Sequence, residues 1–119
     1  MDIEKTSAVF EKLGYAGGAI AEDELRKVRI RFLRNGSECV ELVAPLAEDA
    51  PIKTTLKNMR GATPYHICYC TGDIEAECLT LRKLGWVQTE KPAPAPAIGG
   101  RKVVFLYHKD AGLIELVED

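Results

Sequence analysis

The pattern of apolar and polar positions predicts a short amphipathic helix in the second half of the chain. Four apolar residues recur there at helical spacing: Ile74, Cys78, Leu81 and Leu84. Asp73 stands just before this stripe as a candidate N-cap, and Gly85 follows it as a residue that tolerates the left-handed backbone of a helix end. The pattern therefore predicts one helix between Asp73 and Gly85, with its apolar side buried against a sheet.

Alternation with a period of two predicts strands on both sides of this helix. The ranges with this pattern are 28–32, 39–44, 65–70, 103–107 and 113–117, with weaker candidates at 19–21 and 87–90. Asn35-Gly36 is a tight-turn signal between the first two ranges. Residues 109–112 predict a second turn between the last two.

An internal repeat relates the two halves of the chain. Residues 2–15 match residues 73–86 at an offset of 71, and an aromatic residue closes both segments. Further on, Glu41-Leu42-Val43 recurs as Glu115-Leu116-Val117 at an offset of 74. Two copies are too few for a solenoid, so the repeat favours one pseudo-symmetric domain.

The repeat predicts the fold class and the domain organisation. We expect an α+β protein in which two pseudo-symmetric β-α-β-β-β modules form one curved mixed sheet around a cleft. Module one would cover residues 1–47, a linker helix 48–63 and module two 64–119, together a single domain. The first copy starts at its helix cap, so we expect the first strand of module one to be missing from the chain.

Strand alternation also predicts which side chains leave the helix-packed face of the sheet. In residues 28–32, the apolar Val28, Ile30 and Phe32 would face the helices. The ionisable residues predicted on the helix-free face are Arg29, Arg31, Glu41, His66 and Glu115. Because the two modules would join edge to edge, we expect these side chains to gather in a cleft.

Three of these residues suit a metal ion. One imidazole and two carboxylates, from His66, Glu41 and Glu115, fit a divalent ion such as zinc, nickel, cobalt, manganese or iron. The ion would act as a Lewis acid. The alternative interpretation is that the carboxylates are solvated or salt-bridged and that the histidine is a hydrogen-bonded strand residue.

Composition and charge narrow the function classes. The chain of 119 residues has 16 Lys+Arg against 18 Asp+Glu, a formal charge of −2, which argues against nucleic-acid and anionic-membrane partners. No apolar run approaches the roughly 20 residues of a membrane span, and the amino terminus has no signal-peptide pattern. We therefore expect a cytoplasmic protein with reduced cysteines.

The ordered segments DIEKTSAVFEKLGY, CVELVAPLAEDAPI, PYHICYCTGDIEA and PAIGGRKVVFLYHKDAGLIELVE resemble the vicinal oxygen chelate (glyoxalase/bleomycin-resistance) superfamily. The resemblance is closest to its methylmalonyl-CoA epimerase-like and lactoylglutathione lyase-like branch. It covers nearly the whole chain. In that family the metal ligands lie on the first and last strands of each module, which implies Glu41, His66 and Glu115 here.

Two departures from the family pattern affect the expected site. The family's ligand on the strand before the first helix has no counterpart in this chain. Arg29 and Arg31 stand on the strand where the epimerase has a second catalytic carboxylate, and an arginine cannot act as a base. Their guanidinium groups would instead bind a carboxylate or phosphate of an anionic small-molecule substrate, or would only solvate an open sheet face. We also expect a homodimer that covers the sheet at the missing strand.

These features lead to a primary functional hypothesis and to alternatives. The primary hypothesis is a metal-dependent lyase or isomerase that acts on a small acyl, 2-oxo or thioester substrate through a metal-stabilised enolate, with Glu115 or Glu41 as the catalytic base. The alternatives are a metal-free ligand-binding protein, like the bleomycin-resistance members, and an inactive pseudoenzyme.

Overall fold

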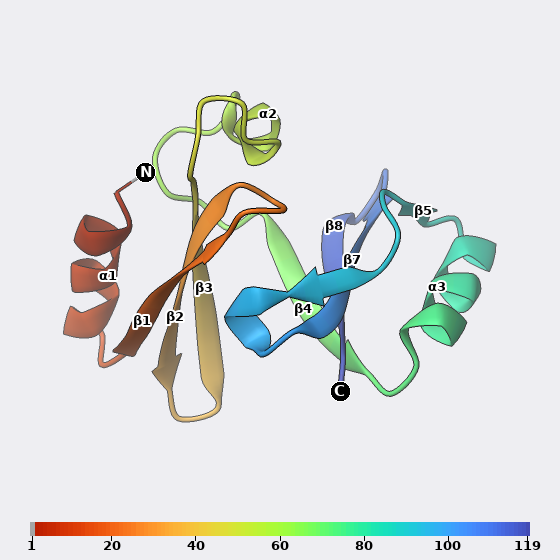
Figure 1. Ribbon diagram of the computed structural model, residues 1–119, viewed down its shortest axis with the longest axis horizontal. Helices are drawn as coiled ribbons and strands as arrows, with labels where there is room; N and C mark the ends of the chain where they lie inside the picture. The colour runs from red at the N-terminus through yellow and green to blue at the C-terminus, as the bar shows by residue number, and fades with distance from the viewer. Residues whose placement is uncertain (1) are drawn as a thin grey trace. The chain divides into compact units, whose positions relative to one another are not determined.

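The computed structural model describes residues 2–119 as two compact units, which meet in the sequence between Thr63 and Pro64 (Figure 1). The elements of the first unit are α1 (Ile3–Lys12), β1 (Ala16–Asp23), β2 (Val28–Asn35), β3 (Glu38–Pro45) and α2 (Ile52–Leu56). Those of the second are β4 (His66–Thr71), α3 (Ile74–Lys83), β5 (Val87–Gln88), β6 (Ala93–Ala95), the 3-10 helix η1 (Pro96–Ile98), β7 (Arg101–His108) and β8 (Gly112–Glu118).

Each unit packs a helix against one face of its own sheet. The first sheet has the order β1-β2-β3 with antiparallel pairs, and α1 covers it. The second has the order β4-β8-β7-β5, in which β4 and β8 run parallel and β6 also pairs with β7. These mixed elements confirm the predicted α+β class. The single domain and the joined sheet stay predictions.

The repeated helices begin and end in the same way. The Asp2 side chain accepts a hydrogen bond from the Lys5 amide at 3.0 Å, and Asp73 accepts one from Ala76 at 3.0 Å. Beyond each helix a glycine adopts positive φ, 97° at Gly14 and 95° at Gly85. Such a glycine turns the chain out of a helix without a Cβ clash. The sequence repeat is therefore also a repeat of capping structure.

Each unit has its own apolar core under its helix. In the first unit the buried cluster is Ile3, Leu33, Leu42 and Ala44. In the second it is Ile74, Cys78, Val104, Leu106, Ile114 and Leu116. Within the second cluster, burial raises the pKa of the Cys78 thiol, with nearby Glu75 acting in the same direction. Cys78 is therefore a packing residue and not a reactive thiol.

The facing of β2 corrects the sequence prediction. In the β2–β3 register Arg31 lies opposite Leu42, and Phe32 lies opposite Glu41. Directly opposed residues share a face, so Arg29 and Arg31 lie on the face of the apolar core under α1. The prediction that these two arginines share the helix-free face with Glu41 is wrong.

Ion pairs explain how α1 accommodates the two guanidinium groups. Arg29 reaches Glu4 at 3.2 Å, and Arg31 reaches Glu11 at 3.5 Å, both on α1. Alternation misled because β2 is buried on both faces: Leu33 packs under α1, and Ile30 on the opposite face is also buried. An apolar alternation alone does not identify the helix side of such a strand.

Several predicted elements have different lengths in the structure. The weak strand predicted at 19–21 is the longer β1, which contains a register shift between Gly17 and Ile20. The strand predicted at 87–90 is the two-residue β5, and the linker helix is only the five residues of α2. Among the described residues, no helix is long and apolar enough to cross a membrane.

Candidate functional site

The face of the second sheet that lies away from α3 carries a histidine and a glutamate on adjacent strands. His66 is the first residue of β4, and Glu115 lies on β8, where it pairs in register with Cys68. Residues two apart on a strand share a face, so His66, Cys68 and Glu115 lie on the same side. Ile114 and Leu116 alternate with Glu115 and are buried in the α3 core. The predicted facing of β4 and β8 is therefore confirmed.

The two ionisable side chains meet. His66 Nε2 lies 3.2 Å from Glu115 Oε2, and the side chains are only 6% and 12% exposed. The contact fixes the orientation of the ring, and the tautomer with its proton on Nδ1 keeps a lone pair on Nε2 that can bind a metal ion. The pair therefore presents one nitrogen and up to two oxygen donors at a single point of the sheet.

Two aromatic rings contact the imidazole of His66. The Tyr65 ring centroid lies 4.4 Å from that of His66, and the Phe105 centroid lies 5.2 Å away, both in edge-to-face geometry. Phe105 lies on β7 directly opposite Glu115. The sequence pattern identifies neither ring as part of the site. The only sequence signal for Phe105 was its strand position, which alternates with the core residues Val104 and Leu106.

Glu41, the third predicted ligand, belongs to the first unit. On β3 it lies between Val40 and Leu42, and both of these pack in the α1 core. Glu41 therefore lies on the face of its sheet that is turned away from α1, as predicted. The structure brings His66 and Glu115 together within the second unit, and the participation of Glu41 stays a prediction.

Arg29 and Arg31 are engaged within their own unit. Besides its α1 partner, Arg31 donates from Nε to the Gly18 carbonyl oxygen at 2.8 Å. Arg29 also lies 4.0 Å from Glu22 on β1. Substrate binding by these arginines stays a prediction. It was inferred from a position on the helix-free face of the sheet, and the two arginines lie on the other face.

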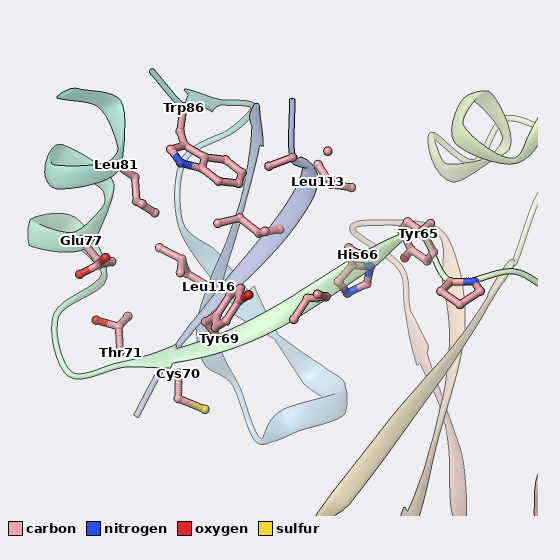
Figure 2. A pocket seen from close by; sticks show the side chains of 15 residues that line it. Tyr65, His66, Tyr69, Cys70, Thr71, Glu77, Leu81, Trp86, Leu113 and Leu116 are labelled. Atoms are coloured by element: carbon pink, nitrogen blue, oxygen red, sulfur yellow. The ribbon is translucent and has the colours of Figure 1, made fainter. Parts of the chain in front are cut away.

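A groove of about 770 Å³ lies between β4 and α3 in the second unit (Figure 2). Tyr69 projects from β4 toward it, while Leu81 and Trp86 line its helix side. Ile67 and Tyr69 are large apolar side chains of β4 that remain 61% and 51% exposed. The sequence pattern does not predict this groove, because the width of the groove depends on the distance between α3 and β4.

Comparisons with known proteins identify the superfamily and find similar proteins among the epimerases. Residues 1–105 match the profile of the glyoxalase/bleomycin resistance protein/dioxygenase superfamily. The ethylmalonyl-CoA/methylmalonyl-CoA epimerase of Cereibacter sphaeroides is 30% identical over 118 residues, which are 97% of this chain and 88% of that protein.

Solved structures give the same result. Methylmalonyl-CoA epimerase from Mycobacterium tuberculosis superposes with a TM-score of 0.82 at 25% identity, covering 98% of this chain and 80% of that one. A variant of the Streptomyces coelicolor methylmalonyl-CoA epimerase, in complex with 2-nitronate-propionyl-CoA, gives a TM-score of 0.81 at 25% identity, with 99% and 87% covered.

Proposed function

This chain belongs to the glyoxalase/bleomycin resistance protein/dioxygenase superfamily, and from that premise we propose that it is a metal-dependent isomerase that epimerises an acyl-CoA thioester. The observation that carries the proposal is the His66–Glu115 pair on the helix-free face of the second sheet, at 3.2 Å. The similarity to an ethylmalonyl-CoA/methylmalonyl-CoA epimerase over nearly the whole chain supports an alkylmalonyl-CoA as the substrate class.

The donor set fits a divalent ion. His66 offers an imidazole nitrogen and Glu115 a carboxylate from adjacent strands, and we propose Glu41 as the third ligand. Two observations support Glu41: it is the repeat equivalent of Glu115, and β3 directs it away from the α1 core. A bound zinc, nickel, cobalt, manganese or iron ion would polarise the thioester carbonyl and so acidify the adjacent C–H bond.

The chain's own carboxylates would move the proton. Epimerisation removes a proton from one face of the carbon next to the thioester and returns one to the other face, with an enolate between the two steps. Glu115 and Glu41 are the candidate proton carriers, and the carboxylate held less tightly as a ligand would be the better base. His66, as a ligand through Nε2, would hold the ion beside the Glu115 carboxylate. Arg29 and Arg31 have no part in this proposal.

Proton exchange at the substrate carbon tests the proposal directly. We expect the protein to exchange the C2 hydrogen of methylmalonyl-CoA for deuterium in D2O when Co²⁺ or Mn²⁺ is present, as measured by mass spectrometry. Glu115→Gln and His66→Ala should each lower the exchange rate and the metal affinity by more than about 100-fold, because even partners outside the ligand shell are worth 10–100-fold.

Matched variants distinguish the site from general damage. Glu118→Gln, also on β8, and His108→Ala, the other histidine of the chain, should retain exchange and metal binding. Exchange that persists after complete chelation would overturn the role of the metal. Tight acyl-CoA binding without any exchange would overturn the isomerase proposal and favour the alternative of a ligand-binding protein.

A further inference from the structure

Phe105 occupies an unusual position relative to the His66–Glu115 pair. Strand β8 lies between β4 and β7 in the sheet, so the backbones that carry His66 and Phe105 are two strand spacings apart, about 9 to 10 Å. The ring centroids are nevertheless only 5.2 Å apart. The two rings therefore reach across β8 and meet over the strand that carries Glu115.

The register places Phe105 where it can limit how the imidazole turns. Phe105 is the cross-strand partner of Glu115, so its ring rises from the sheet beside the carboxylate. The interplanar angle between Phe105 and His66 is 84°, an edge-to-face arrangement that is lost when either ring rotates. In this orientation Nε2 of His66 points to Glu115.

We infer that Phe105 is a positioning residue that holds the imidazole of His66 with Nε2 directed at Glu115, and thereby prepares the nitrogen for the ion of the proposed function. The ring contacts the histidine and supplies no ligand atom of its own. A metal site loses affinity when its ligands must be ordered on binding, so a preset imidazole favours the bound state.

The first test follows the ring itself and needs no metal. The chain has two histidines, which makes the imidazole NMR signals simple to assign. In the wild-type protein at one fixed pH, we expect nuclear Overhauser effects from the His66 ring to Phe105 and to the Glu115 methylene protons. Phe105→Leu keeps an apolar side chain but removes the ring, and it should weaken the His66–Glu115 effects by averaging the imidazole over several rotamers.

The second test measures Co²⁺ affinity by absorption titration. An edge-to-face ring pair is worth about 0.5 to 1.5 kcal/mol, so Phe105→Leu should weaken Co²⁺ binding roughly two- to tenfold and change the shape of the visible bands. Phe105→Tyr retains the ring and should restore both. Tyr107→Leu, two residues along β7 at a side chain that is 48% exposed, is the control and should change neither.

The two tests separate this inference from the proposed function on which it rests. Unchanged imidazole contacts in Phe105→Leu would overturn the positioning role, whatever the metal does. Wild-type protein that binds no Co²⁺ would overturn the metal proposal, while the imidazole contacts would still decide the role of Phe105. Equal Co²⁺ affinity in Phe105→Leu and wild type would overturn the claim that the preset imidazole aids metal binding.

Discussion

The two units share their helix caps but use the face under the helix differently. Under α3, β7 contributes Val104 and Leu106, which are both fully buried. Under α1, β2 contributes the fully buried Leu33 and, beside it, Arg29 and Arg31, which are held by α1 glutamates. A repeat can therefore conserve how a helix begins and ends while ion pairs are added to the apolar packing beneath one of the two helices.

The other faces of the two sheets show a closer correspondence. Phe32 lies opposite Glu41 across β2 and β3, just as Phe105 lies opposite Glu115 across β7 and β8. The second unit adds β4, which brings His66 to its pair.

The largest effects should come from the two cores. Leu106→Ala in the second unit and Leu33→Ala in the first each remove a side chain of 0% exposure, and each should lower the free energy of unfolding by about 2 to 5 kcal/mol. Urea denaturation monitored by circular dichroism measures both. If one of the two variants left the urea midpoint unchanged, the two helix-covered faces would not contribute equally to the free energy of unfolding.

A smaller effect should come from the arginine-lined face alone. A Cβ at Gly17 would lie 2.5 Å from Nη2 of Arg31, so Gly17→Ala must displace the guanidinium that bonds to Gly18. We expect a loss of about 1.5 kcal/mol, the lower end of the range for a hydrogen bond to a charged group, because the displaced group is the end of a flexible side chain.

The matched background for Gly17→Ala is Arg31→Ala, where no guanidinium remains to be displaced. Gly17→Ala should then cost much less, as a double-mutant cycle would measure. An equal cost in both backgrounds would assign the effect of Gly17→Ala to backbone strain instead of the arginine.

The smallest effects should come from the shared caps. Asp73→Ala should cost about 1 kcal/mol in thermal unfolding. The Lys5 amide that donates to Asp2 lowers the pKa of that carboxyl. A lowered pKa in the folded state adds stability above the unfolded-state value near 4, and this stability is lost as the pH falls through the lower, folded value. Asp2→Asn should remove this part of the acid dependence, and an unchanged acid profile would contradict it.

The sequence predicted the parts of the molecule that depend on local pattern. The helix caps at Asp2 and Asp73 follow from the spacing of residues along the sequence. The facing of Glu115 follows from strand alternation, since a polar residue between two core residues must point to the opposite face of the sheet. The facing of β2 could not be predicted, because both of its faces are partly apolar.

The contact between the rings of Phe105 and His66 could not be predicted from the sequence pattern either. It joins side chains on strands that are not neighbours, and it depends on how far each ring reaches over β8. Spacing along one strand carries no information on such a reach. The same limit applies to the groove beside α3, whose shape depends on helix placement.

The buried thiol of Cys78 can be used to detect local unfolding of the second unit. Cys78 is 1% exposed, whereas Cys39, Cys68 and Cys70 are exposed. Alkylating reagents would therefore modify three thiols at once and the fourth only when α3 detaches from its sheet. The rate of the slow phase, in which Cys78 is alkylated, therefore measures local unfolding of the second unit without any added label.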